Sequence, residues 1–276
     1  MNILYPKNMS HYKYLFLPLL YCCFFCIHTV SAQSGRCGQT LQWNISDSIL
    51  TISGQGAMDN MDPIGEVFTP WYSQREGVKK IILSEGVTHI GNVAFLGFSL
   101  LEDVSFPTTL SAIGSDAFSG CSRLQSVQCP ERLEKIEDYA FSACTSLKSV
   151  CLQNTSLNEI QAGVFYGCSS LADVRLPQTL SFIGNNAFKD CVSLSDIPFP
   201  QKLERIGDDA FRACTSLKRI SFPEGFHTLG SRAFDVCANL ESVSFPSTLR
   251  YIGYWAFGAC KKLKGEIVLP EGFTEM

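Results

Sequence analysis

The sequence predicts an elongated, predominantly β solenoid, and two observations support that prediction. A phenylalanine is followed three residues later by a cysteine at a fixed interval of 23 residues, with a single step of 24. Upstream of each pair lies a short alternating segment that most often ends at a proline. A fixed period of this length indicates that no unit buries its own apolar face, so consecutive units must stack. The pairs are Phe118/Cys121, Phe141/Cys144, Phe165/Cys168, Phe188/Cys191, Phe211/Cys214, Phe234/Cys237 and Phe257/Cys260.

Each repeat divides into three sides. The first is an alternating triplet, typical of a half-buried strand, and stacking of the triplets in register predicts a parallel sheet. The second is a short extended segment of the pattern Leu-x-x-Ile, and the third is expected to be a short helical turn around the phenylalanine, capped by a small polar side chain. The triplets begin at Val104, Val127, Val150, Val174, Ile197, Ile220 and Val243, and the expected caps are Ser115, Asp138, Asn185, Asp208 and Ser231. The additional residue of the 24-residue step predicts a small protruding bulge within 152–157.

The chain is expected to comprise three parts. Residues 1–32 are interpreted as an export signal, because Lys7 and Lys13 precede an apolar run that ends at small residues. A membrane anchor is the alternative, but the run falls short of the roughly 20 residues that cross a bilayer. Residues 33–77 are predicted to form an N-terminal cap with a β-hairpin over 41–53, over which Trp71 packs. Residues 78–276 form the solenoid, and its last repeat is incomplete.

Ten cysteines follow the predicted signal, which would ordinarily suggest disulfides in an exported chain. Seven of them occupy one repeat position, so their neighbours lie one strand spacing apart, about 4.8 Å. A disulfide needs Cβ atoms about 3.8 Å apart. The sequence therefore predicts free, buried thiols, with Cys151 as the one cysteine facing solvent on the first sheet.

Charge and histidine content point away from several functions. Without residues 1–32 the chain carries 20 basic and 26 acidic residues, so no nucleic-acid partner is expected. Only His89 and His227 remain, six coils or roughly 30 Å apart. That separation leaves a Ser or Cys nucleophile without a histidine base and two histidines without a shared metal. No catalytic, cofactor or metal residue is assigned, and an enzyme such as a carboxylate-pair hydrolase is disfavoured.

Two surfaces are candidates for binding. The outward residues of the first sheet are small, polar and of mixed charge, which suits a broad protein or glycan contact. They are Asp103, Ser105, Ser126, Gln128, Asp173, Arg175, Asp196, Arg219, Ser221, Ser242 and Ser244. Tyr251, Tyr254 and Trp255 gather on the last complete coil, where aromatic residues indicate either a contact surface or packing of the solenoid end. End-to-end self-association is one expectation for that cluster.

The repeat, Leu-x-x-Val/Ile-x-Phe/Leu-Pro-x-x-Leu-x-x-Ile-Gly-x-x-Ala-Phe-x-x-Cys, resembles that of the BspA-like leucine-rich repeat family, which is related to the treponemal type. The resemblance covers about residues 78–273, and the segments 37–38, 50–58 and 70–71 are similar to that family's N-terminal cap. Phe98 in the first cysteine position, Glu137 and Gln161 in place of the repeat glycine, and the inserted Gly265 depart from the pattern.

The resemblance implies a non-enzymatic protein, secreted or displayed at the cell surface, that mediates adhesion. Relatives bind host matrix proteins such as fibronectin or fibrinogen, or other bacterial cells, and share no catalytic residues. The identity of the ligand does not transfer, because the repeat preserves the core while the outward residues vary. The alternative is a structural role in which the C-terminal coil docks end-on against another chain.

Overall fold

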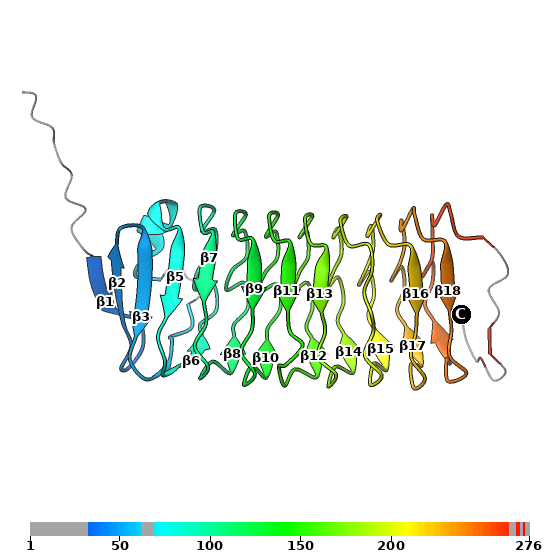
Figure 1. The fold of residues 1–276 in the computed structure, drawn as a ribbon, viewed down its shortest axis with the longest axis horizontal. Coiled ribbons are helices and arrows are strands. Elements are labelled where there is room, and N and C mark those ends of the chain that lie inside the picture. The colour runs from blue at the N-terminus through cyan, green and yellow to red at the C-terminus, as the bar shows by residue number, and fades with distance from the viewer. Residues whose placement is uncertain (1–32, 62–68, 265–268, 271–272, 274–276) are drawn as a thin grey trace, which may run out of the picture. The chain divides into compact units, whose positions relative to one another are not determined.

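A computed structural model of the protein describes residues 33–61, 69–264, 269–270 and 273. The predicted signal segment, 1–32, and most of the incomplete last repeat lie outside the described residues. The described part of the repeat region is a stack of coils whose short strands run parallel from one coil to the next (Figure 1). This arrangement confirms the predicted β solenoid.

The N-terminal end of the stack is a small antiparallel sheet joined to the first coils. Strand β1 (Gln33–Arg36) pairs with β2 (Gln42–Ser46), and β2 pairs with β3 (Ile49–Ser53), so the predicted hairpin is present. Strand β3 then pairs in parallel with β5 (Lys80–Leu83), and β4 (Gly56–Ala57) pairs with β6 (Val87–Ile90). Strand β3 thus joins the antiparallel hairpin to the parallel strands of the repeats.

The first side of the coils carries three-residue strands whose middle residue points inward. Equivalent residues pair across coils, as in Val127, Val150 and Val174. These strands are β7 (Asp103–Ser105), β9 (Ser126–Gln128), β11 (Ser149–Cys151), β13 (Asp173–Arg175), β16 (Arg219–Ser221) and β18 (Ser242–Ser244). The expectation of a strand at Ile197-Pro198-Phe199 is wrong, because this triplet forms no strand. Pro198 has no N–H to donate to the ladder.

The second side carries short strands, of two residues in every case but the four-residue β6, that form two separate sheets. These strands are β6, β8 (Ala112–Ile113), β10 (Lys135–Ile136), β12 (Glu159–Ile160), β14 (Phe182–Ile183), β15 (Arg205–Ile206), β17 (Thr228–Leu229) and β19 (Tyr251–Ile252). One sheet has the order β10-β8-β6-β4 and the other β12-β14-β15-β17-β19. The sheets separate where the 24-residue step falls.

The additional residue of that step is accommodated by a tight turn that is only partly exposed. Gln153 and Asn154 lie at the surface, whereas Thr155 is buried and its hydroxyl donates a 2.8 Å hydrogen bond to the carbonyl of Leu152. Within the expected bulge, 152–157, only Gln153, Asn154 and Ser156 are therefore exposed.

The third side consists of turns rather than helix. The one helix of the described residues is the short 3-10 helix η1 (Tyr72–Gly77), in the cap. Four of the five residues expected to cap a helical turn, Ser115, Asp138, Asn185 and Asp208, bond forward to the next coil instead. The Asn185 Oδ1 atom accepts a 2.8 Å hydrogen bond from the Asp208 amide, and Asp208 Oδ1 accepts one of 2.7 Å from the Ser231 amide. The backbone of this side also bonds from coil to coil, as in the 2.7 Å bond from Phe188 N to Ala210 O.

The core is a column of stacked phenylalanines beside a column of thiols. Ring centroids of successive coils are 5.1 Å apart for Phe118 and Phe141 and 5.1 Å apart for Phe188 and Phe211. Each repeat thiol donates a hydrogen bond of 3.1–3.3 Å to the carbonyl of the phenylalanine in the preceding coil, which a plain hydrophobe could not do. The donor–acceptor pairs are Cys121–Phe95, Cys144–Phe118, Cys168–Phe141, Cys191–Phe165, Cys214–Phe188, Cys237–Phe211 and Cys260–Phe234.

All ten cysteines of the described residues are free, which confirms the prediction of unpaired thiols. Eight are buried, and burial raises the pKa of a thiol such as Cys214 because the thiolate loses its hydration. Cys151 and Cys260 are half-exposed, and burial raises the pKa of Cys260 to about 11.

Thiol reactivity should therefore separate Cys151 from the other nine. We expect the folded protein without residues 1–32, and therefore without Cys22, Cys23 and Cys26, to react rapidly with Ellman's reagent at pH 8 at Cys151 alone. Only a thiolate attacks, and the other described thiols are buried or held protonated. Reaction of all thiols should follow only in denaturant. A Cys151→Ser variant is the control and should lose the rapid phase. Rapid reaction of several thiols in the folded Cys151→Ser protein would contradict the buried column.

Candidate binding surfaces

The eleven outward residues predicted for the first sheet are all exposed on one side of the stack. Ten flank the inward middle residue of strands β7, β9, β13, β16 and β18, and Asp196 lies in the coil without a strand. Three of the charged side chains on this face, those of Asp103, Asp173 and Arg175, form local ion pairs. The Lys80 Nζ atom lies 2.8 Å from Asp103 Oδ2, and Arg175 Nε lies 3.6 Å from Asp173 Oδ2. The face therefore presents mixed charge without a field of one sign.

A groove of about 420 Å³ opens on this side of the stack at the coil in which Pro198 takes the middle position of the strand triplet. Among the described residues no backbone hydrogen bond joins 195–199 to either neighbouring coil. We call this depression the Pro198 groove, and Phe199 in it is half-buried. Three of the predicted face residues line it. Its lining is Gln153, Ala172, Asp173, Val174, Arg175, Leu176, Gln178, Asp196, Pro198 and Phe199.

A second groove of about 460 Å³ contains another half-buried phenylalanine, Phe106, and the predicted face residue Gln128. The turn of the 24-residue step lines both grooves. It contributes Asn154 to this groove and Gln153 to the Pro198 groove. The outward face could be identified from the sequence, whereas neither groove was predicted. The visible signal of the Pro198 groove was a proline in the middle of a strand triplet.

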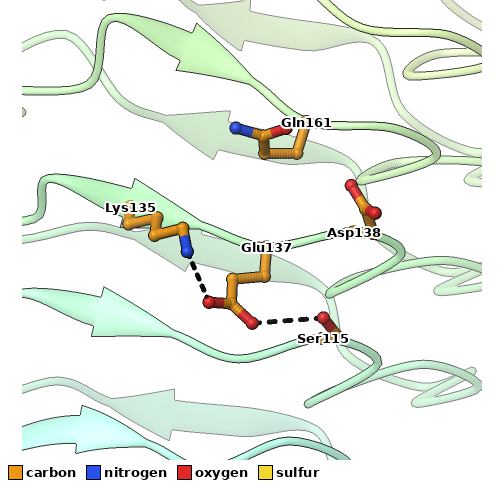
Figure 2. A pocket seen from close by; sticks show the side chains of 5 residues that line it. All are labelled: Ser115, Lys135, Glu137, Asp138 and Gln161. Carbon is orange, nitrogen blue, oxygen red and sulfur yellow. Dashed lines mark hydrogen bonds and ion pairs between the residues drawn. The ribbon is translucent and has the colours of Figure 1, made fainter.

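A polar hollow of about 290 Å³ lies on the second side of the coils, around Glu137 and next to strands β10 and β12 (Figure 2). Glu137 Oε1 accepts a 2.7 Å hydrogen bond from Lys135 Nζ, and Oε2 accepts one of 3.2 Å from the Ser115 hydroxyl. The hydrogen bond from Lys135 lowers the pKa of the Glu137 carboxyl. Asp138 accepts the Ala162 amide, and Gln161 donates to Glu159. These side chains thus already have hydrogen-bond partners in their own or adjacent coils.

The described residues contain no group of three or more His, Cys, Asp or Glu side chains arranged to hold a metal ion. His89 contacts Asn60 at 3.4 Å, and His227 Nδ1 lies 2.9 Å from the Thr228 hydroxyl. The structure places the two histidines in separate coils, as expected. Within the described part of the chain no helix is long and apolar enough to span a membrane.

The aromatic cluster of the last complete coil is open to solvent. Tyr254 is 73% exposed and Trp255 is 58% exposed, with their ring centroids 5.8 Å apart. Tyr251 lies in β19 and is half-buried. At the opposite end Trp71 is buried as predicted, stacked on Phe95 at 5.7 Å and edge-on to Trp43 at 5.9 Å. The aromatic residues are thus buried at the N-terminal end of the stack and exposed on the last complete coil.

Parallel strands repeated in register, with a leucine and an isoleucine of each coil directed into the core, define this chain as a leucine-rich repeat protein. The model of the BspA type leucine rich repeat region matches residues 71–194 and 181–276. The chain therefore belongs to the BspA-type leucine-rich repeat family. A search of curated proteins found no match to the chain.

Several solved structures are similar to this chain. The leucine-rich repeat protein of Treponema pallidum has 23% sequence identity and a TM-score of 0.52, over 83% of this chain and 90% of that one. A leucine-rich cell surface protein of Faecalibacterium prausnitzii has 21% identity and a TM-score of 0.46, over 88% and 84%. The pneumococcal vaccine antigen PcpA has 16% identity and a TM-score of 0.42, over 87% and 92%. At these identities the treponemal likeness supports the fold alone.

Proposed function

We propose that this protein is a non-enzymatic, exported or surface-displayed binding protein that holds a protein partner on the outward face of its first sheet. The observation that carries the proposal is the face itself. Its exposed polar residues are fixed in one register over many coils and are bordered by two grooves, each with a half-buried phenylalanine. Rigid strands that present a polar surface around partly buried aromatic side chains suit protein recognition.

The export signal predicted for residues 1–32 and the family support a location at the cell surface or outside the cell. Adhesion to host matrix proteins or to other cells is the role that such a location favours. A glycan ligand is the alternative occupant of the same face, since polar side chains of mixed charge also bind sugar hydroxyls.

Binding assays on the intact chain test the proposal. Immobilised protein is titrated with fibronectin, fibrinogen and purified bacterial surface proteins, and a glycan array is run alongside. For the protein partner that binds, Arg175→Ala and Arg219→Ala should each weaken affinity about tenfold or more, because interface arginines are frequent hot spots. Both side chains are exposed on the first sheet.

Arg205→Ala is the matched control. Arg205 lies in β15 of the second side, with its guanidinium 4.7 Å from the ring centroid of Phe182. Its replacement should leave affinity unchanged. Saturable binding to glycans alone would replace the protein-partner proposal with the glycan alternative. Equal losses in all three variants, or no saturable ligand, would contradict the assignment of this face.

A further inference from the structure

The coil that contains Pro198 interrupts the sheet on the first side of the stack. Strands β9, β11 and β13 form one sheet, β16 and β18 form another, and the segment 195–199 between them belongs to neither. On the second side the same coils remain paired, because β15 pairs with both β14 and β17. The interruption therefore affects the face on which the Pro198 groove opens and leaves the second side intact.

Backbone groups along this interruption lack the partners that equivalent groups have in other coils. Leu152 N donates a 2.9 Å hydrogen bond to Arg175 O, whereas the equivalent Leu176 N has no acceptor among the described residues. Lys148 O accepts two amides of the next coil, at 3.0 Å and 3.1 Å, whereas the equivalent Ala172 O accepts none within the described part of the chain. Both an N–H and a carbonyl of the sheet edge are thus open beside the groove.

The carbonyl of Val174, which lines the groove, is the group that proline leaves without a donor. In a strand the N–H and C=O of one residue point toward the same neighbouring strand. Arg175 holds in its coil the position that Pro198 holds in the next, and Arg175 O accepts Leu152 N from the coil before it. The N–H at position 198 would therefore be directed at Val174 O, and proline has none. Among the described residues no other donor reaches this carbonyl.

The charged side chains of the groove favour a cationic guest. Asp173 is already paired with Arg175, whose Nε lies 3.6 Å from Asp173 Oδ2. Asp196 is exposed, and its carboxylate has no ion pair or hydrogen bond within the described ranges. The lining therefore carries two carboxylates and one guanidinium. A cation that reaches Asp196 gains attraction without displacing an existing pair.

The remaining lining combines an apolar floor with free amides. Pro198 is exposed, and Phe199 is half-buried with its ring stacked on that of Phe222 at 5.7 Å. Phe199 is thus held in place by the core while part of its side chain faces the groove. Gln153 and Gln178 are exposed, and neither side-chain amide has a hydrogen bond among the residues that the structure describes. An apolar surface with a few unused polar groups suits a peptide.

We infer that the Pro198 groove binds an extended, basic segment of the protein partner. An N–H of the segment donates to Val174 O, a lysine or arginine pairs with Asp196, and an apolar side chain beside that cation packs on Phe199. Open backbone groups at the edge of a sheet are what an extended peptide recognises, because its own N–H and C=O groups complement them. This inference rests on the function proposed for the first-sheet face and names the part of the partner that the face holds.

Pro198→Ser tests the role of the missing N–H. Serine holds the equivalent position at the end of β16 and at the end of β18, which pair in register. The substitution returns a donor for Val174 O, so we expect the segment 195–199 to join the sheet and the groove to close. Exchange of the Leu176 amide should slow by about tenfold or more, because that amide gains an acceptor in the same sheet. The variant should melt no lower than the unaltered protein, so a loss of binding would not reflect unfolding.

Asp196→Asn removes the free charge of the groove alone. Asp103→Asn is its matched control, because Asp103 holds the same repeat position, lies outside the groove and is already paired with Lys80. The probe is the peptide acetyl-Val-Lys-Val-Lys-Val-amide, and acetyl-Val-Glu-Val-Glu-Val-amide is the control peptide. Binding is followed by NMR as changes in the chemical shifts of the Leu176 and Phe199 amides.

The lysine peptide should shift both amides saturably, and the glutamate peptide should not. Asp196→Asn should weaken binding of the lysine peptide about threefold or more, as loss of an exposed ion pair does. Pro198→Ser should weaken it about tenfold or more, because the open backbone groups are then used within the sheet. Asp103→Asn should leave it unchanged. Equal binding of the two peptides, or undiminished binding to Pro198→Ser, would overturn the inference.

The same variants separate this inference from the proposed function. A protein partner that loses affinity on Arg219→Ala but not on Pro198→Ser or Asp196→Asn would leave the first-sheet face as the binding surface and refute the groove as its peptide site. Saturation of the groove by the lysine peptide, without a saturable protein partner for the chain, would support the groove and contradict the proposed function.

Discussion

Truncation of Phe188 to alanine is expected to lower the free energy of unfolding by about 3–5 kcal/mol, the range for a fully buried phenylalanine. Phe188 is completely buried in a central coil, and its ring lies 5.3 Å from that of Phe165 and 5.1 Å from that of Phe211. Removal of the ring leaves a cavity with stacked neighbours on both sides. These neighbours belong to different coils, whose backbones are held by the ladders and cannot collapse into the space.

The matched control is Phe257→Ala. Phe257 holds the same repeat position in the last complete coil, is only half-buried, and stacks on Phe234 at 5.6 Å. Its loss should cost less than half as much, because solvent can fill part of the space. Urea denaturation followed by circular dichroism measures both variants. Midpoints for Phe188→Ala that match those of the unaltered protein, or of Phe257→Ala, would be incompatible with a continuous aromatic column.

The repeat positions that face the core could be predicted from the sequence, because stacking places each core residue on the equivalent residue of the neighbouring coil. Each coil rests on its equivalents, so the phenylalanine, the thiol and the branched residue of the strand must recur at one spacing. Phe188 and Cys191 are in this class, and both are completely buried. The parallel register follows from the same periodicity.

The form of the third side could not be predicted in the same way. A short apolar segment after a small polar residue is typical of a capped helical turn, and Asp208 fits that pattern. The backbone bonds between coils instead, which requires positive φ at residues such as Tyr139 and Arg232. Residues of this type rarely adopt positive φ alone, and here the ladder to the next coil compensates for the strain.

The candidate face was predictable only in outline. Alternation within each triplet places residues such as Arg175 and Arg219 outward, and the structure agrees. The Pro198 groove depends on a backbone group that is missing, since a proline cannot donate to the ladder. The exposure of Phe199 depends on how its neighbours pack, and the periodicity of the sequence does not predict that packing.

Gly230→Ala is expected to destabilise the protein by about 3 kcal/mol, at the upper end of the range for overpacking. A Cβ atom at Gly230 would lie 2.4 Å from the Gly207 carbonyl carbon, 2.5 Å from the Asp208 nitrogen and 2.6 Å from the Gly207 oxygen. All three are backbone atoms of the preceding coil, so no rotamer change relieves the contact. The two coils must therefore move apart. This movement lengthens the hydrogen bonds between β15 and β17 and the backbone hydrogen bonds between the same coils on the third side.

Gly77→Ala is the control, because a Cβ atom there meets nothing within 4 Å, and it should shift stability by no more than about 0.5 kcal/mol. Two coils have another residue in place of the repeat glycine. Before Glu137 the strands β8 and β10 still pair, with the Phe118 and Phe141 rings 5.1 Å apart. Before Gln161, where the 24-residue step also falls, β10 and β12 do not pair and the Phe141 and Phe165 rings lie 5.9 Å apart. If thermal melts of Gly230→Ala and Gly77→Ala coincide, close approach of the coil backbones is not what requires glycine at this position.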